Sequence, residues 1–207
     1  MSRIARIMQT SPVIPVLVVD DAGHAGPLAR ALSAGGLKVL EVTLRTPAAL
    51  DAIRRMGAEA PDTIVGAGTV LNADDLKRAV DAGARFIVSP GLTPGLARAA
   101  EAADVPLLPG VATCGEIMGG LDLGLEHFKF FPAENVGGAA ALKSIAGPFA
   151  KVRFCPTGGI TPQNAPAYLA LSNVLCVCGS WVAPKAAVTS GDWQAIGTLA
   201  REAAALA

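Results

Sequence analysis

A regular succession of short apolar runs constrains this chain more than any other feature of its sequence. The runs are rich in Val, Ile and Leu, and they start 20 to 26 residues apart. Runs of this length are typical of buried strands, and we predict eight of them. They lie near residues 13–19, 37–44, 63–70, 86–90, 106–112, 127–133, 151–157 and 173–179. Between consecutive strands there is room for one helix and two short loops, which is the repeat of a parallel sheet.

The segments between these runs are rich in Ala, Leu, Arg and Glu, and their apolar residues stand three or four positions apart. This spacing predicts helices that cover a sheet with one face. The clearest are Pro47–Ala60, Asp74–Ala82, Pro94–Ala103, Gly137–Ile145 and Asp192–Leu206, and a short helix is expected before the first strand, at about 2–10.

Residues that commonly end or start helices stand at the expected places. Glycines follow the segments where helices should end, at Gly35-Gly36, Gly83 and Gly124. Thr46-Pro47 and Thr161-Pro162 each combine an N-cap residue with a proline suited to the first helical position.

Alternation of eight strands with helices predicts an α/β protein whose parallel strands close into a compact (β/α)8 TIM barrel. No linker or change of composition divides the sequence, so we expect residues 1–207 to form a single domain. An open doubly wound sheet is the alternative. It is disfavoured because residues 19–24 read VDDAGH, without the Gly-x-Gly-x-x-Gly turn that follows the first strand of a dinucleotide-binding sheet.

The composition excludes several classes of partner. There are 17 basic and 17 acidic side chains, so no basic field is available to hold a nucleic acid. Aromatic residues make up only 4% of the chain, too few for base stacking. No apolar run approaches the roughly 20 residues of a membrane-spanning helix, and the N-terminus lacks a signal peptide's apolar region. We therefore expect a cytoplasmic protein with no nucleic-acid and no membrane partner.

Cysteine and histidine are too scarce for a disulfide framework or a metal site. The four cysteines are embedded in apolar runs or isolated, and only two histidines are present. We interpret these cysteines as small, reduced, buried side chains, and we expect neither a metal nor a cofactor. The four cysteines are Cys114, Cys155, Cys176 and Cys178.

Charged residues inside two of the strands are the best candidates for chemistry. Barrel active sites lie at the C-terminal ends of the strands, and alternate residues of a strand share a face. Glu41, Thr43 and Arg45 therefore point together into the barrel, while Val42 and Leu44 point to the helices. In the sixth strand Lys129 shares a face with His127 and Phe131, and Phe128 and Phe130 point outward.

Lys129 is the most informative of these residues, because lysine is almost never buried without a partner or a purpose. A lysine on an edge strand can reach water, but a closed barrel has no edge. The functional interpretation is a desolvated amine of lowered pKa that forms a Schiff base with a carbonyl substrate. Glu41 is then either an ion-pair partner for Lys129 or Arg45, or the group that moves protons during imine formation. We favour the second role.

Loops after other strands offer groups that bind anions. Gly158-Gly159 follows the seventh strand and Gly179-Ser180 the eighth, the place where barrels commonly bind phosphate through loop amides. Arg45 and Thr69 suit a carboxylate, because a guanidinium and a hydroxyl match its oxygens.

Several of these segments closely resemble the 2-keto-3-deoxy-6-phosphogluconate (KDPG) aldolase family. The resemblance covers about residues 13–181, in order and at the family's spacing. Its main segments are Glu41–Arg45, Val65–Val70, Phe128–Glu134 and Arg153–Ile160, with Ser89–Thr93 and Gly179–Trp181 in support. It implies a class I aldolase of the Entner–Doudoroff pathway. Such an enzyme cleaves KDPG to pyruvate and glyceraldehyde 3-phosphate, as a homotrimer without a metal.

The resemblance also implies roles for individual residues. Lys129 would be the Schiff-base lysine and Glu41 the acid/base. Arg45 and Thr69 would hold the substrate carboxylate, and the phosphate would lie on Gly158, Gly159 and Ser180. Thr157, Pro90 and Phe131 would line the pocket. One departure is Cys178, which stands where the family usually has the first glycine of Gly-Gly-Ser, and it is expected to narrow the phosphate end.

Three other functions remain open from the sequence. Two are aldolases that use the same lysine, one acting on 2-keto-4-hydroxyglutarate (KHG) and one on the 6-phosphogalactonate analogue of KDPG. The third is a non-catalytic barrel that binds a sugar phosphate, which the combination of Lys129 with Glu41 disfavours.

Overall fold

The computed structural model describes residues 1–206, and its strands are all parallel. A six-stranded sheet has the order β5-β4-β3-β2-β1-β9, and a three-stranded sheet has the order β6-β7-β8. The first contains β1 (Val13–Leu17), β2 (Val39–Thr43), β3 (Ile64–Gly68), β4 (Ile87–Val88), β5 (Leu107–Leu108) and β9 (Val177–Gly179). The second contains β6 (Gly110–Val111), β7 (His127–Phe130) and β8 (Arg153–Pro156).

The two sheets approach each other at both edges. Only Pro109 separates β5 from β6, and proline has no N–H with which to continue a ladder. At the other edge, isolated parallel bridges join Phe154 to Val174 and Thr157 to Cys178. All eight predicted strand regions are thus present in a parallel α/β fold. The ladder of hydrogen bonds is divided between two sheets, where one continuous barrel sheet was predicted.

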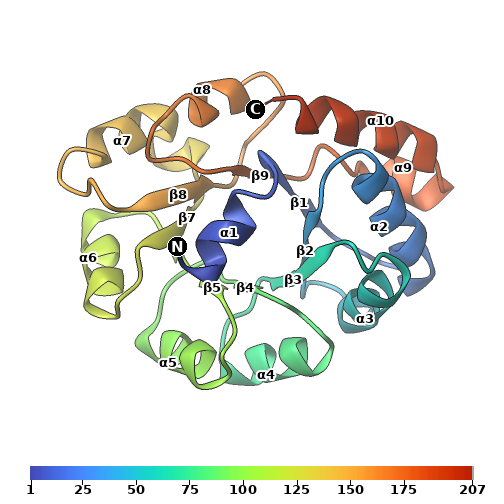
Figure 1. Ribbon diagram of the computed structural model, residues 1–207, viewed down its shortest axis with the longest axis horizontal. Coiled ribbons are helices and arrows are strands. Elements are labelled where there is room, and N and C mark those ends of the chain that lie inside the picture. The colour runs from blue at the N-terminus through green and yellow to red at the C-terminus, as the bar shows by residue number, and fades with distance from the viewer. Residues whose placement is uncertain (207) are drawn as a thin grey trace.

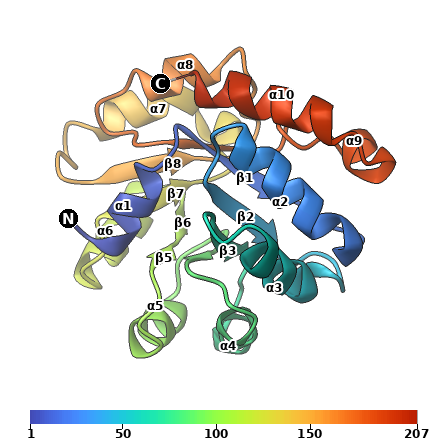
Figure 2. The same cartoon turned by 45° about the vertical axis from the view of Figure 1, so that its right-hand side comes forward.

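The helices that connect successive strands lie outside the strands in both views of the chain (Figures 1 and 2). Those that follow the strands are α2 (Ala25–Ala34), α3 (Ala49–Glu59), α4 (Ala73–Asp81), α5 (Pro94–Ala102), α6 (Cys114–Asp122), α7 (Gly138–Ile145), α8 (Ala165–Leu169), α9 (Lys185–Ser190) and α10 (Trp193–Ala204). Short 3-10 turns, η1 (Ala22–His24) and η2 (Glu134–Val136), precede α2 and α7.

The predicted helix ends are confirmed, but two predicted helix starts are wrong. Gly36, Gly83 and Gly124 have positive φ, as expected of residues that end helices. The helix after β2 begins at Ala49, since the Thr46 hydroxyl donates to the Val19 carbonyl at 2.5 Å and accepts no hydrogen bond from the first turn of the helix within residues 1–206. The helix after β8 likewise begins at Ala165, because residues 161–164 form a closed turn before it.

A short helix, α1 (Arg3–Met8), crosses the end of the strand assembly where the strands begin (Figure 1). Its buried residues Ile4, Ile7 and Met8 belong to the same apolar cluster as Ile14 of β1 and Val39 of β2. This helix therefore closes the space between the strands at that end.

Side chains alternate between two apolar clusters, as the strand pattern predicts. The larger cluster lies between strands and helices and contains Phe128 and Phe130, which pack against Phe154 with ring centroids 6.4 and 6.2 Å apart. The smaller cluster lies among the strands and includes Phe86, Val88, Leu108 and three of the cysteines. The predicted outward direction of Phe128 and Phe130 is confirmed.

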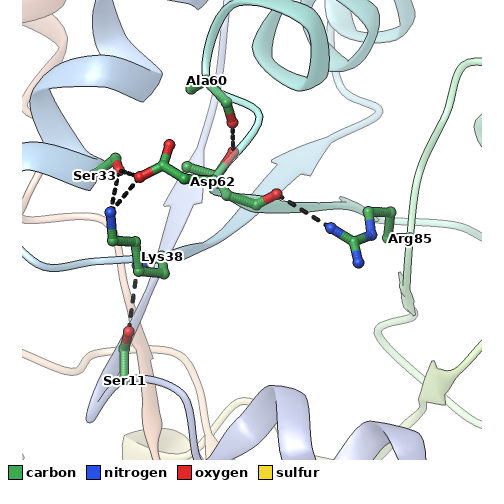
Figure 3. Close-up of polar contacts among 7 residues, drawn as sticks. Ser11, Ser33, Lys38, Ala60, Asp62 and Arg85 are labelled. Atoms are coloured by element: carbon green, nitrogen blue, oxygen red, sulfur yellow. Dashed lines mark hydrogen bonds and ion pairs between the residues drawn. The ribbon is translucent and has the colours of Figure 1, made fainter.

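A polar network ties several chain segments together near the strand beginnings (Figure 3). The Lys38 ammonium bonds Asp62 and donates to the Ser33 hydroxyl at 2.8 Å, and that hydroxyl donates to Asp62 at 2.7 Å. The Lys38 backbone N–H donates to Ser11 at 3.3 Å. These contacts join the segment before β1, α2, the start of β2 and the segment before β3.

Replacing Asp62 with Asn should lower the free energy of unfolding at neutral pH but not in acid. Hydrogen bonds from Lys38 and Ser33 hold the pKa of Asp62 below its usual value of about 4. A carboxyl whose pKa is lower in the folded state stabilises the fold above its unfolded pKa, and this contribution is lost as the pH falls through the folded pKa. Urea unfolding of wild type and Asp62→Asn at about pH 7 and about pH 2 measures the difference.

The matched control is Asp122→Asn, at the exposed end of α6, since Asp122 has no ion-pair partner within residues 1–206. It should change little at either pH. A loss of stability in Asp62→Asn that is equally large at both pH values would contradict the expectation.

Candidate active site

Lys129 and Glu41 form a buried ion pair among the strands. Lys129 is in β7, between Gly110 and Cys155 in the strand register, and is 5% exposed. Glu41 is in β2 and is fully buried. The Lys129 Nζ lies 3.5 Å from Glu41 Oε1 and 5.2 Å from the centre of the Phe131 ring. Of the two partners open to Glu41 from the sequence, the structure selects Lys129 and not Arg45.

The predicted lowering of the Lys129 pKa is wrong for the protein without a ligand. Burial lowers the pKa of this amine, but the neighbouring Glu41 carboxylate raises it, and the result lies above the ordinary value. Hydrogen bonding between thiols, together with burial, raises the pKa of Cys155 and Cys178, which are therefore uncharged at neutral pH. The carboxylate at 3.5 Å is thus the group that keeps the ammonium charged.

Two thiols lie beside this pair. The Cys178 thiol donates to Glu41 Oε2 at 3.6 Å, and its sulfur is 3.3 Å from that of Cys155. The interpretation of Cys155, Cys176 and Cys178 as buried, reduced side chains is confirmed, whereas Cys114 is exposed. The contact of Cys178 with Glu41 was not predicted, although the period of two already placed Cys176 and Cys178 on one face of their strand.

Arg45 and Thr69 meet at the C-terminal ends of β2 and β3. The Arg45 Nε donates to the Thr69 hydroxyl at 3.1 Å, and Thr69 has a φ of 59°, a left-handed conformation that is rare for threonine. Within residues 1–206 no carboxylate pairs with Arg45. The guanidinium is therefore available to an anionic group of a ligand.

A pocket of about 260 Å³ opens beside Arg45 and is lined by loops that follow β7, β8 and β9. It brings together six of the predicted site residues. They are Arg45, Phe131, Thr157, Gly158, Gly159 and Ser180. Cys178 lines the same pocket and also touches Glu41, so it links the pocket to the buried pair.

The glycine loop after β8 presents free backbone donors. Gly158 and Gly159 have φ values of 101° and 77°, which side chains with a Cβ rarely adopt. In the part of the chain that the structure describes, the N–H groups of Gly158, Gly159 and Ser180 donate to no protein acceptor. Unpartnered amides at one end of a pocket suit an anion with several oxygens.

Four predicted residues do not line the pocket. Lys129 and Glu41 are buried and connect to it through Phe131 and Cys178, and Thr69 connects through Arg45. Pro90 is half-buried in the loop after β4, and its carbonyl lies against Gly110, where a Cβ would come within 2.1 Å.

Gly68 is a neighbour of the pair that the sequence did not single out for this role. A Cβ added there would lie 2.1 Å from Glu41 Oε1 and 2.7 Å from Glu41 Cγ. The Glu41 carboxylate therefore occupies the space in which a side chain at position 68 would lie. A glycine inside a strand is the sequence signal for such close approach.

The sequence of residues 4–199 matches the family model described as KDPG and KHG aldolase. The chain belongs to the KDPG and KHG aldolase family. A KHG/KDPG aldolase of Escherichia coli is 57% identical over 197 residues, which cover 95% of this chain and 92% of that protein.

Solved structures of KDPG aldolases have the same fold. The enzyme of Zymomonas mobilis, solved with 3-phosphoglycerate, is 56% identical and superposes with a TM-score of 0.94 over 99% of this chain and 96% of that one. The enzyme of Legionella pneumophila was solved with pyruvate captured as a covalent carbinolamine. It is 47% identical and has a TM-score of 0.95 over 98% of each chain.

Two further findings concern metal binding and membrane spanning. No group of three His, Cys, Asp or Glu side chains within residues 1–206 is arranged so that it could hold a metal ion. None of the helices in the same range has both the length and the apolar character that crossing a bilayer requires.

In this member of the aldolase family, Gly68→Ala should break the contact between Lys129 and Glu41. The new methyl group would overlap the Glu41 carboxylate, which would have to move away from Lys129. Overpacking of this kind costs about 1–3 kcal/mol of folding free energy. A crystal structure of the variant measures the Nζ–Oε1 distance, and urea unfolding measures the loss of stability.

The control is Gly57→Ala in α3, where no atom lies within 4 Å of the added Cβ. It should raise the free energy of unfolding by about 0.5–1 kcal/mol, because alanine is the better helix former. A Gly68→Ala variant that keeps both its stability and the 3.5 Å contact would refute the role given to Gly68.

Proposed function

We propose that this protein is a class I aldolase that cleaves KDPG to pyruvate and glyceraldehyde 3-phosphate, through a Schiff base on Lys129. The observation that carries the proposal is the buried pair of Lys129 and Glu41 beside a pocket with free backbone donors, in a chain of the KDPG and KHG aldolase family. The carbinolamine of pyruvate in the Legionella pneumophila relative supports the covalent route.

The 3.5 Å contact explains how the nucleophile arises although the Lys129 pKa is raised. Transfer of one proton from Nζ to Glu41 Oε1 converts the ion pair into a neutral amine and a neutral acid. The neutral amine then attacks the C2 ketone of the substrate, and the Glu41 acid protonates the ketone oxygen to give the carbinolamine.

The later steps use the same two residues. Loss of water from the carbinolamine gives a protonated imine, which can accept an electron pair. Glu41 takes the proton of the C4 hydroxyl, the C3–C4 bond breaks, and its electrons pass to the imine to form an enamine as the aldehyde leaves. Protonation of the enamine at C3 and hydrolysis of the imine by water release pyruvate and restore Lys129.

The remaining site residues bind the two ends of the substrate. Arg45 and Thr69 hold the carboxylate, which their 3.1 Å contact and the free guanidinium support. Gly158, Gly159 and Ser180 hold the phosphate with backbone N–H groups and the serine hydroxyl. Thr157 and Phe131 line the pocket between the two ends. Pro90 supports the wall from the loop after β4.

Activity on KHG is a second candidate function. It is favoured by the Escherichia coli relative, which is called a KHG/KDPG aldolase. The first steps on Lys129 would be the same, and the distal group would be a carboxylate in place of the phosphate.

We also propose that the two sheets act as one closed eight-stranded barrel, in a single domain that spans the chain. The one-residue gap at Pro109 and the bridge from Thr157 to Cys178 support closure. A homotrimer in the cytoplasm is the proposed working form. The free cysteines support a reducing compartment, and sedimentation velocity of the purified chain tests the trimer.

Borohydride reduction in the presence of pyruvate should attach the three-carbon unit to Lys129. Reduction converts the imine to a stable amine, so mass spectrometry of the peptides locates the modified lysine. Lys129→Ala should give no adduct and should lower turnover by at least about 10³-fold. Lys151→Ala, which removes an exposed lysine, should behave as wild type. An adduct on another lysine, or none in wild type, would refute the mechanism.

Rates on three substrates should separate the candidate functions. KDPG should have a higher kcat/KM than KHG, since only the phosphate can use all the free donors of the glycine loop. The 6-phosphogalactonate analogue carries the same phosphate and differs at C4, so its rate tests the choice of C4 configuration. Ser180→Ala should raise KM for KDPG by about ten- to hundredfold, the effect of one lost hydrogen bond to a charged group, and leave the KM for KHG less affected. A higher kcat/KM on KHG would favour the second function.

A further inference from the structure

The Glu41 carboxylate has very few partners for a buried charge. Its Oε1 lies 3.5 Å from Lys129 Nζ and has no hydrogen bond. Its Oε2 accepts from the Cys178 thiol at 3.6 Å. No other group within residues 1–206 donates a hydrogen bond to this side chain. A carboxylate offers about four acceptor sites and is normally bonded at several when buried. The orientation of Glu41 therefore depends on Lys129 at one oxygen and Cys178 at the other.

The Cys178 side chain is set up to be the donor of this contact. It is 1% exposed and belongs to the cluster of side chains among the strands. Its sulfur also lies 3.3 Å from the Cys155 sulfur, so a second thiol contacts the Cys178 side chain. Burial and hydrogen bonding keep the pKa of Cys178 well above the ordinary value, so its S–H proton is present at neutral pH.

The space around Glu41 leaves no second way to fix the carboxylate. Gly68 faces Oε1 without a side chain, and its neighbour along the strand, Ala67, points to the helices. Without a donor at Oε2 the carboxylate could rotate about its terminal bond and lose its alignment with Lys129. Proton transfer between two groups requires that their atoms stay within hydrogen-bond reach.

We propose that Cys178 is a positioning residue of the reaction: its S–H group donates to Glu41 Oε2 and thereby keeps Oε1 directed at Lys129 Nζ. This inference rests on the proposed aldolase function, in which Glu41 moves the protons. It gives Cys178 a role at the reacting end of the site, in addition to its place on the wall of the pocket.

Three variants test the proposal. Cys178→Ala removes the donor, and Cys178→Ser keeps an O–H donor of nearly the same shape. Cys176→Ala is the matched control, because Cys176 is a fully buried thiol in the same cluster with no hydrogen bond to Glu41 within the described residues.

We expect Cys178→Ala to lower kcat about three- to tenfold with little change in KM, the effect of one hydrogen bond lost from a weak donor. Cys178→Ser, which keeps a donor, should restore kcat to within about twofold of wild type. Cys176→Ala should keep the wild-type kcat and KM, so packing loss alone does not produce the effect.

The readouts separate failure of this inference from failure of the proposed function. If wild type forms no pyruvate adduct on Lys129, the aldolase mechanism fails first and the inference falls with it. If wild type forms the adduct but Cys178→Ala keeps the wild-type kcat, or Cys176→Ala shows the same loss of kcat, the role of Cys178 is refuted while the mechanism stands.

An infrared measurement decides the case in which Cys178→Ala does not fold. The S–H stretching band of the wild-type protein that is lost in Cys178→Ser belongs to Cys178. The proposal expects this band at the lowered frequency of a thiol bonded to a carboxylate. A band at the frequency of a free thiol overturns the proposal without any activity measurement.

Discussion

Burial of a lysine and a glutamate as a pair is the constraint on which this site depends. Removing either charge from water alone costs several kcal/mol, and only the attraction between the two groups offsets that cost. The pair must therefore be held at short distance, and here strands do this more rigidly than loops could. Glu41 sits opposite Val16 and Gly66 in the register of β2, and Lys129 sits opposite Gly110 and Cys155 in β7. A slip of one residue in either strand would turn one charge toward the helices and leave the other without a partner.

Several residues around Lys129 and Glu41 are small, because the pair needs space among the strands. A Cβ at Gly68 would overlap the Glu41 carboxylate, and one at Gly66 would come within 2.3 Å of the Phe86 ring. Gly68 thus leaves room for the Glu41 carboxylate, and Gly66 leaves room for the Phe86 ring. On the far side of Glu41 the neighbours are thiols, which are small enough to pack among apolar side chains and can still donate one weak hydrogen bond.

The sequence predicted the strands and their faces well because both depend on a period of two, which is visible without coordinates. Lys129 and Glu41 stood out for the same reason, as charges inside apolar runs. The direction of the Lys129 pKa was predicted wrongly, because it depends on a distance of 3.5 Å to a residue 88 positions away. The helix start at Thr46 failed on a tertiary contact too, since its hydroxyl bonds the Val19 carbonyl. Patterns along the chain thus identify which residues face inward, and only the fold decides what each one meets there.

The two ends of the strands have different roles. Residues where the strands begin stabilise the fold, and residues where the strands end form the candidate site. Where the strands begin, α1 covers the interior, and Lys38, Asp62 and Ser33 satisfy one another across segments that are far apart in the sequence. Where they end, the terminal nitrogens of Arg45 and the backbone amides of Gly158, Gly159 and Ser180 have no protein partner within residues 1–206, and Thr69 has an unusual φ. A bound anion that accepts hydrogen bonds from these donors would add its binding free energy to the stability of the fold. The same reasoning explains why Glu41, deeper in the structure, keeps one bare oxygen: a fully satisfied carboxylate would be a poorer carrier of protons.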